Sequence, residues 1–426
     1  MSKFVDANEA LKVVKSGDRV AVGHATGEPQ ALTGALWDRR DELKNVEIVH
    51  MVCMGKGMYC LPEAGDSFHH NSLFIGGTAR KAFAEGRADF VPVHFSDIPS
   101  LFLDDYLPTD VALVQACPPD KNGYMSLGIS VDYTLAIVKK AKTVVVQVNK
   151  NMPRTHGDCF IHISEADYIV ECDEPLLELP RAPLSGQDYA IGKYCASLVP
   201  DGATLQLGIG SLPDAVLSSL TEKNDLGIHS EMFSDGVMEL VRAGVVNNSK
   251  KTLHKGKMVA TFIMGTKELY EFIDDNPMLY MAPANYVNDP FVIAQNENMV
   301  SINSCVQIDL AGQVCAESVG LKQISATGGQ ADFIRGANHS RGGTSIIAMP
   351  SVTKDLKTSK IVPLLDEGAT VTTPRTDVKY IVTEYGIASL FGKNLRQRAR
   401  ELINIAHPSF RESLKAEYEK RFYEKF

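Results

Sequence analysis

Glu231 is the residue of this chain whose position best suits covalent chemistry. It lies just after a predicted apolar strand, in the sequence Ile228-His-Ser-Glu231, and it precedes a predicted helix beginning near Phe233. The hydroxyl groups of Ser230 and Ser234 flank it. The end of a buried strand is where α/β enzymes usually present reactive side chains. A carboxylate there can attack an acyl group, provided that a nearby donor stabilises the resulting oxyanion. A solvated surface glutamate is the competing interpretation.

Two glycine-rich stretches supply the backbone N–H groups that such a reaction needs. Gly328 and Gly329, within residues 327–333, let their N–H groups approach a ligand because no side chain obstructs them. Gly208-Ile-Gly210 follows a strand and opens a helix, so it can bind a phosphate, a thioester oxygen or a pantetheine amide. Ordinary glycine turns remain the alternative for both. Pro213 stands where the dinucleotide fingerprint has its third glycine, which argues against a Rossmann oxidoreductase.

The first half carries a turn that matches the Gly208 turn, and its polar side chains are candidate contacts for the acyl group or the acceptor. They are His24, Glu28 and Gln30. A structural role for His24 is equally compatible with the sequence. Two other groups stay open between a functional and a structural role. The first group is Arg154, His156 and Asp158, which either form a loop near the active site or make structural ion pairs. The second is Glu384, which is a candidate hydrogen-bond partner of Glu231 or of a substrate.

Metal-binding patterns are not indicated by this sequence. His69 and His70 are adjacent, so their side chains diverge on any regular element, and no Cys, Asp or Glu completes a ligand set nearby. We interpret them as part of a surface loop. The eight cysteines are scattered without Cys-x-x-Cys spacing and lie mostly in apolar runs, which is typical of buried, reduced thiols.

An internal repeat defines the architecture that must position these residues. Residues 17–23 and 202–208 have the same pattern of apolar strand, glycine turn and Pro-started helix. Three further matches follow in the same order: 74–78 with 262–266, 97–99 with 288–290, and 120–123 with 309–312. The offset stays at about 185 to 191 residues, which indicates a duplication. Symmetry breaks at Glu231, because its counterpart Met51 is apolar.

Short apolar runs alternating with helical stretches predict an α/β fold with mainly parallel sheets. The predicted strands are 19–22, 46–49, 111–114, 143–148, 167–170, 204–207, 258–263, 300–302, 344–349 and 379–382. Two prolines and a glycine in residues 179–186 predict the linker. We therefore expect two halves, 1–185 and 186–426, related by a pseudo-twofold axis with the active site between them. The second half ends in a helix pair, with Ser409 as an N-cap.

Length and charge limit the classes of partner. A chain of 426 residues suits two domains. Its net charge of -9, without a dense Lys/Arg tract, argues against nucleic acid. The N-terminus lacks a signal-peptide core and no window approaches a membrane span, so we expect a cytoplasmic protein without membrane contact.

Five separated motifs together resemble the acetyl-CoA hydrolase/transferase family, most closely its 4-hydroxybutyrate and butyrate CoA-transferases. They are Gly208-Ile-Gly210, residues 229–236, residues 328–333, residues 153–158 and residues 383–392. The similarity covers essentially the whole chain. It implies a class I CoA-transferase of acetyl-CoA, 4-hydroxybutyrate, butyrate and fatty acid metabolism, expected to be a homodimer.

The resemblance also implies roles for particular residues. Glu231 forms a covalent glutamyl-CoA thioester, and Gly329, with Gly328, contributes to the CoA or oxyanion site. The stretch that lines bound CoA is Gln206, Leu207, Gly208, Ile209 and Gly210. Coenzyme A is thus a substrate and no permanent cofactor is implied. A hydrolase using the same glutamate is the alternative, and the sequence leaves the physiological donor and acceptor open.

Overall fold

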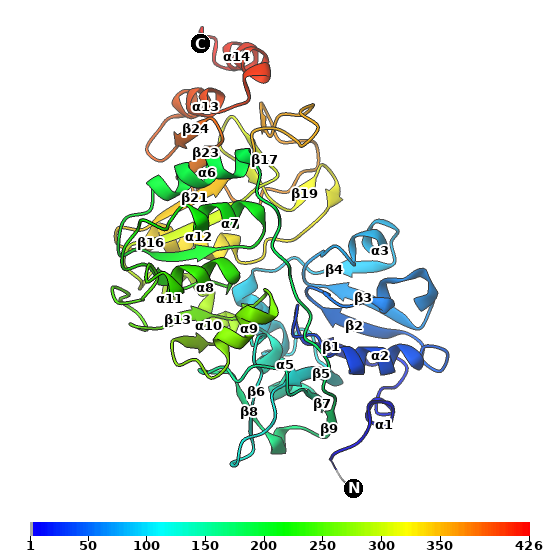
Figure 1. The fold of residues 1–426 in the computed structure, drawn as a ribbon. Coiled ribbons are helices and arrows are strands. Elements are labelled where there is room, and N and C mark those ends of the chain that lie inside the picture. The colour runs from blue at the N-terminus through cyan, green and yellow to red at the C-terminus, as the bar shows by residue number, and fades with distance from the viewer. Residues whose placement is uncertain (1–2) are drawn as a thin grey trace. The chain divides into compact units, whose positions relative to one another are not determined.

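The structure is a computed structural model that describes residues 3–426 (Figure 1). The chain forms two units. Unit 1 comprises Met1–Pro180 and Lys257–Asn288, and unit 2 comprises Arg181–Gly256 and Asp289–Phe426. The first point at which the chain passes from unit 1 to unit 2 therefore lies in the predicted linker. The second predicted half is nevertheless not continuous, because residues 257–288 pack with unit 1.

Unit 1 is built on a seven-stranded sheet with the order β4-β3-β2-β1-β5-β7-β9, in which all pairs are parallel. Its strands are β1 (Arg19–Val22), β2 (Val46–His50), β3 (Phe68–Ser72), β4 (Ala88–Phe90), β5 (Val111–Ala116), β7 (Thr143–Val148) and β9 (Tyr168–Glu171). The helices are α1 (Ala7–Leu11), α2 (Gln30–Asp38), α3 (Arg80–Ala84), α4 (Ile98–Leu103) and α5 (Thr134–Lys140). β5 is buried at every position, as expected of a central parallel strand.

The returning segment of unit 1 adds small elements and not a strand of the large sheet. The predicted single strand 258–263 is two short strands, β13 (Met258–Ala260) and β14 (Phe262–Ile263), and β13 pairs in parallel with β15 (Leu279–Met281). α9 (Lys267–Ile273) and α10 (Ala284–Val287) complete it. An antiparallel pair, β6 (Tyr124–Ser126) and β8 (Phe160–His162), also belongs to this unit.

Unit 2 is built on a six-stranded sheet with the order β11-β10-β16-β21-β23-β24. The strands are β10 (Thr204–Leu207), β11 (Gly227–Ile228), β16 (Met299–Ser304), β21 (Thr344–Ala348), β23 (Tyr380–Thr383) and β24 (Gly386–Ser389). Only β24 runs antiparallel to its neighbour. The helices are α6 (Gly186–Ser197), α7 (Ser211–Ser218), α8 (Asp235–Arg242), α11 (Pro290–Ile293), α12 (Gln330–His339), α13 (Leu395–Asn404) and α14 (Pro408–Phe422).

The two large sheets repeat one order of strands. β2-β1-β5-β7-β9 in unit 1 has its counterpart in β11-β10-β16-β21-β23 in unit 2. The matched Asp-x-x-Gly turns agree as well, because Asp120 and Asp309 each accept hydrogen bonds from the N–H groups two and four residues ahead. This agreement is what a duplication predicts. The pseudo-twofold relation itself stays a prediction.

Two helix boundaries differ from the expectation. α8 begins at Asp235, because the short strand β12 (Met232–Phe233) follows Glu231 first. At the C-terminus the N-cap of α14 is His407 and not Ser409, since Pro408 takes the first helical position and the His407 side chain accepts a hydrogen bond from the Ser409 N–H.

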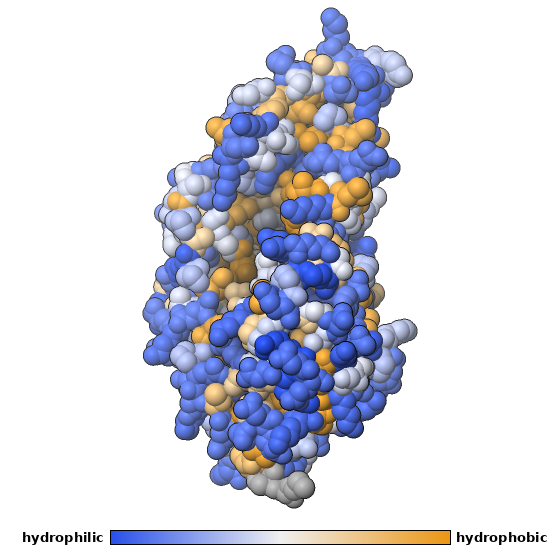
Figure 2. Space-filling model, turned by 90° about the vertical axis from the view of Figure 1, so that its right-hand side faces the viewer, coloured by the Kyte–Doolittle hydropathy of each residue, from blue (hydrophilic) through white to orange (hydrophobic). Residues whose placement is uncertain are grey.

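The surface of the protein carries mostly polar residues on the face that we view here. On the face drawn in Figure 2, hydrophilic residues predominate and hydrophobic residues gather in scattered groups. Among residues 3–426, no helix combines the length and the apolar character needed to cross a membrane.

Candidate active site

The Gly208 turn lies at the end of β10. Gln206 is buried and exchanges two side-chain hydrogen bonds with Asn303 on the neighbouring strand β16, of 3.2 and 3.1 Å. Beyond Leu207 the chain becomes accessible, and Ile209 is 39% exposed. Gly210 has a φ of 107°, a conformation that requires glycine, and it forms the N-cap of α7. The N–H groups of the first turn of α7 are thereby presented beside this turn.

α6 fixes the position of α7. Gly192 of α6 lies so close to α7 that a Cβ atom there would come within 2.5 Å of the Ala215 carbonyl oxygen. Asp188 completes the capping box of α6 with Ser185 and also accepts a hydrogen bond of 3.4 Å from the hydroxyl of Ser211, the first residue of α7. The helix that opens with the Gly208 turn is therefore held by close packing and by a polar link.

Glu231 follows β11, the edge strand next to β10, and its side chain is partly exposed. The hydroxyl oxygen of Ser230 lies 3.1 Å from the carbonyl oxygen of Leu207 and 2.6 Å from that of Met232, and its single proton is shared between these two acceptors. This buried side chain ties the segment of Glu231 to the end of β10. Gly208, Ser230 and Ser234 surround one tightly packed gap, so the segment that carries Glu231 and the first glycine turn are neighbours.

Two side chains from one loop complete the free edge of β11. The N–H of Ile228 donates to Asn248 Oδ1 (3.0 Å), and the carbonyl oxygen of Ile228 accepts from Lys251 Nζ (2.7 Å). Lys251 is only 3% exposed, and burial lowers its pKa to about 7. A buried amine thus supports the strand that presents Glu231. Nothing in the local sequence pattern indicated either residue.

Lys251 makes the stability of the protein depend on pH. Below pH 7 the Lys251 amine is protonated in both the folded and the unfolded protein, and the folded protein carries the full penalty of a buried cation. Between about pH 7 and the ordinary pKa of 10.5 only the unfolded state binds the proton, so stability rises with pH. We expect urea unfolding to show wild-type stability rising relative to Lys251→Met by up to about 1.4 kcal/mol per pH unit in this window. A pH-independent difference would contradict this assignment.

The Gly328–Gly329 pair precedes α12. Both glycines are buried, Gly328 has a φ of 54°, and Gly329 is the N-cap of the helix. His229, two residues before Glu231, stacks edge-on against Phe333 in α12, with ring centroids 6.2 Å apart. The structure therefore brings the three predicted segments of unit 2 to neighbouring elements. The expected spacing between a glycine N–H and an acyl oxygen stays a prediction.

Glu384 has partners other than those expected. Its Oε1 accepts from the hydroxyl of Ser351 and from Gln187 Nε2, both at 2.6 Å, and its Oε2 accepts from the N–H of Ser351 at 2.9 Å. Gln187 lies on α6. This carboxylate therefore fastens α6 to the end of β21 and β23, which is a structural task.

His24 of unit 1 is buried and its Nδ1 lies 3.1 Å from Asp132 Oδ2. Asp132 is also buried, and it accepts from the Tyr133 N–H and from the hydroxyls of Ser130 and Thr134. The Phe262 ring packs edge-on against the imidazole with centroids 4.7 Å apart. The local environment of His24 is that of an integrated core residue, and a contact with substrate stays a proposal.

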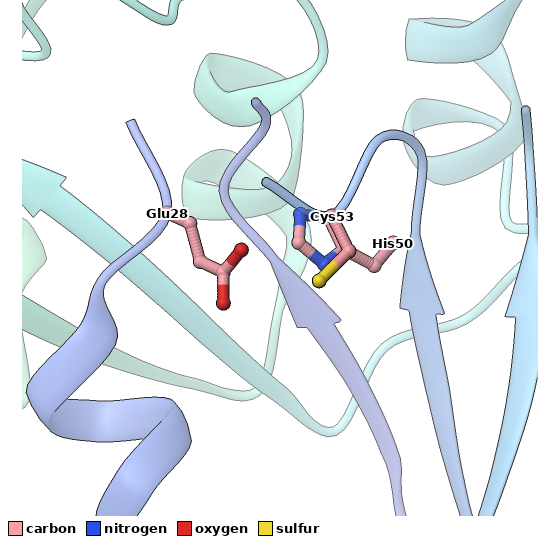
Figure 3. A group of neighbouring side chains, drawn as sticks. All are labelled: Glu28, His50 and Cys53. Carbon is pink, nitrogen blue, oxygen red and sulfur yellow. The ribbon is translucent and has the colours of Figure 1, made fainter. Parts of the chain in front are cut away.

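Glu28 belongs to a buried polar cluster with His50 and Cys53. Figure 3 shows the carboxylate of Glu28 pointing toward the imidazole and the sulfur, and the three donor atoms lie within 4.8 Å of one another. Burial raises the pKa of the Glu28 carboxyl and of the Cys53 thiol and lowers that of His50, so the neutral forms are favoured. A metal ion would require both acids to release protons. The Gly55 N–H donates to Glu28 Oε2 (2.9 Å), and the Tyr59 hydroxyl lies 2.5 Å from His50 Nδ1.

Arg154, His156 and Asp158 do not form a cluster with one another. Each reaches a different partner: Asp120 (3.1 Å), Asp275 (2.9 Å) and the hydroxyl of Tyr280 (3.3 Å). Two of these partners belong to the returning segment 257–288, so the structural interpretation of this loop applies. These contacts also explain why the segment packs with unit 1.

His69 and His70 lie on β3, and the predicted surface loop is wrong. Phe68, His70 and Ser72 are the buried positions of this strand, and the His70 Nδ1 lies 3.2 Å from the Ile48 carbonyl oxygen. His69 lies on the opposite face, where it is exposed and contacts Asp89. The two side chains diverge, as the sequence indicated.

Comparison with known proteins agrees with this architecture of parallel-sheet units and strand-end glycine turns. The family model for the acetyl-CoA hydrolase/transferase N-terminal domain matches residues 1–178, and that for the C-terminal domain matches residues 265–418. The chain belongs to the acetyl-CoA hydrolase/transferase family.

Individual relatives match along nearly the full length. A 4-hydroxybutyrate coenzyme A transferase of Clostridium kluyveri is 59% identical over 99% of this chain and 98% of that protein. A butyryl-CoA:acetate CoA-transferase of Anaerostipes caccae is 40% identical over 98% and 96%. The crystal structure of a 4-hydroxybutyrate CoA-transferase from Porphyromonas gingivalis superposes with a TM-score of 0.86 at 43% identity, covering 98% of each chain.

Proposed function

We propose that this protein transfers coenzyme A between a short-chain acyl-CoA, butyryl-CoA or 4-hydroxybutyryl-CoA, and acetate. The observation that carries the proposal is the partly exposed Glu231 at a strand end, tied through Ser230 to the Gly208 turn. The full-length similarity to proteins named as CoA-transferases supports the same activity.

The proposed mechanism is an exchange in two covalent stages. The Glu231 carboxylate attacks the thioester carbonyl and forms a C–O bond, the C–S bond breaks, and CoA leaves as the thiolate, so that a mixed anhydride of the acyl group and Glu231 remains. The thiolate then attacks the glutamyl carbonyl, which releases the first acid as its carboxylate and leaves a glutamyl-CoA thioester. Acetate attacks this thioester, and the same steps run in reverse. Thioester energy is retained as long as water is excluded from the anhydride.

Each group of glycines has a task in this proposal. The backbone N–H groups at Gly328 and Gly329 stabilise the oxyanion that forms when the carbonyl is attacked. Gln206, Leu207, Gly208, Ile209 and Gly210 line the bound CoA. The open end of α7 offers its N–H groups to an anionic or carbonyl oxygen.

For the acyl group we propose contacts in unit 1 at Glu28 and Gln30, with His24 as a further candidate. Glu28 and Gln30 line a cavity of about 130 Å³ together with Trp37 and Phe68. An aromatic wall with a few polar groups is the kind of lining that small-molecule sites have.

Substrate alone separates a transferase from a hydrolase. With butyryl-CoA as the only substrate, we expect a stoichiometric enzyme–CoA adduct and no continuing release of free CoA, because the acceptor is missing. Acetate then restores turnover. Steady CoA release without acetate would instead indicate the hydrolase. A panel of acyl-CoA donors assayed with acetate identifies the preferred acid.

Assembly and location remain proposals of the same kind. We propose a cytoplasmic homodimer that holds no permanent cofactor or metal and binds neither nucleic acid nor membrane. Light scattering after size exclusion measures the oligomeric state, and a mass equal to one chain would contradict the dimer.

A further inference from the structure

Glu317 is a buried carboxylate in the segment that leads to the Gly328–Gly329 pair. It lies between β18 (Val314–Cys315) and β19 (Ser318–Val319) and is 4% exposed. Its Oε2 accepts hydrogen bonds from the hydroxyls of Thr327 (3.0 Å) and Thr372 (3.1 Å), and its Oε1 accepts from Gln323 Nε2 (3.4 Å). Burial of a carboxylate is unfavourable unless such bonds satisfy it, so this position serves a specific purpose.

The backbone of Glu317 holds the same segment. Its carbonyl oxygen accepts from the N–H groups of Ile324 (2.9 Å) and Ser325 (3.1 Å). Main chain and side chain together therefore fix the chain from residue 324 to Thr327. Between Glu317 and residue 324 the chain forms a hairpin of β19 and β20 (Lys322–Gln323). Leu321 at its tip is 89% exposed, so it does not pack in the core.

Thr327 connects this network to the glycine pair. Its hydroxyl donates to Glu317, and its carbonyl oxygen accepts from the N–H of Gln330, the first residue of α12. Gly328 and Gly329 lie between these two anchored points. Glycines lack side chains that could pack, so the orientation of their N–H groups depends on the anchors at both ends.

We propose that Glu317 is a positioning residue for acyl transfer, because its carboxylate holds Thr327 and thereby keeps the N–H groups of Gly328 and Gly329 aimed at the acyl oxygen. The inference rests on the proposed function of this glycine pair. A displacement of about 1 Å at a reacting centre can lower a rate by about 100-fold, so a remote anchor has a measurable effect.

The chain offers a matched pair of variants, because Thr327 and Thr372 donate to the same oxygen of Glu317 and only Thr327 adjoins the glycines. The experiment measures the rate of enzyme–CoA adduct formation at saturating butyryl-CoA in a single turnover. We expect Thr327→Val to lower this rate about 10- to 100-fold with little change in the affinity for CoA. Thr372→Val also removes the acceptor of the Ala316 N–H (3.0 Å), so it should lower the unfolding temperature at least as much as Thr327→Val and still leave the rate within about threefold of wild type.

Substitutions of Glu317 itself complete the test. Glu317→Gln retains an acceptor for both threonines and should retain more of the rate than Glu317→Ala. In the double variant Glu317→Gln/Thr327→Val the two effects should be non-additive, since both act on one link. An unchanged rate in Thr327→Val, or an equal loss in Thr372→Val, overturns the inference while the proposed function stands. A wild-type enzyme that forms no adduct with any acyl-CoA overturns the proposed function, and this inference with it.

Discussion

Glu231→Ala is expected to lose both the CoA adduct and acyl transfer, by at least about 1,000-fold, while it still binds CoA. A nucleophile must become covalently attached whenever donor is present without acceptor, whereas a general base passes on a proton and leaves no trace. Mass spectrometry of the peptide spanning residues 228–242, after incubation with butyryl-CoA, should show CoA linked to Glu231. Borohydride should inactivate the enzyme only after the donor has been added.

A suitable control is Glu239→Ala. Glu239 lies on α8, is exposed, and pairs with Arg181 at 2.8 Å, so its loss should leave the adduct intact. Labelling at Glu384 would contradict the assignment to Glu231. We do not expect it, since Ser351 and Gln187 already occupy that carboxylate.

Asp132→Ala is expected to destabilise unit 1 by about 3–5 kcal/mol. The substitution removes the acceptor of three buried donors, the Tyr133 N–H and the hydroxyls of Ser130 and Thr134, as well as the partner of His24. Buried polar groups without a partner are unfavourable because water cannot replace the lost bond. Guanidinium unfolding monitored by circular dichroism measures the loss.

Asp89→Ala provides the comparison for this measurement. Asp89 is 75% exposed and pairs with His69, so its removal should leave the unfolding midpoint within experimental error. Equal shifts in both variants would mean that the Asp132 network has no special weight in the stability of unit 1.

The strands and the principal site segments follow from local pattern. The predicted strands at 19–22, 143–148 and 204–207 coincide with β1, β7 and β10, because buried parallel strands read as short apolar runs bounded by turns. The same reasoning placed Glu231 just beyond a strand and Gly208–Gly210 at the start of a helix. The common strand order of the two sheets agrees with the repeat.

Contacts over long sequence separation were beyond this reasoning. Glu384 and Gln187 lie 197 residues apart, and the backbone N–H of Arg154 donates to Asp274 Oδ1 across 120 residues. Glu317 and Lys251 have no local signature, since a charged residue in an irregular segment is normally solvated. Only the tertiary structure shows that each is buried and hydrogen-bonded next to the functional segments.

The path of the chain between the units has a consequence for biosynthesis. Unit 1 needs residues 257–288, which follow the first 76 residues of unit 2 (Arg181–Gly256) in the sequence. A ribosome must therefore synthesise about two thirds of the polypeptide before unit 1 can fold completely. Residues 1–180 thus leave the ribosome first but cannot form all their contacts until residues 257–288 have followed. Cutting the gene at the apparent linker would yield a fragment in which His156 and Asp158 lack Asp275 and Tyr280. A version that retains unit 1 alone must instead join residues 257–288 directly to residues 1–180.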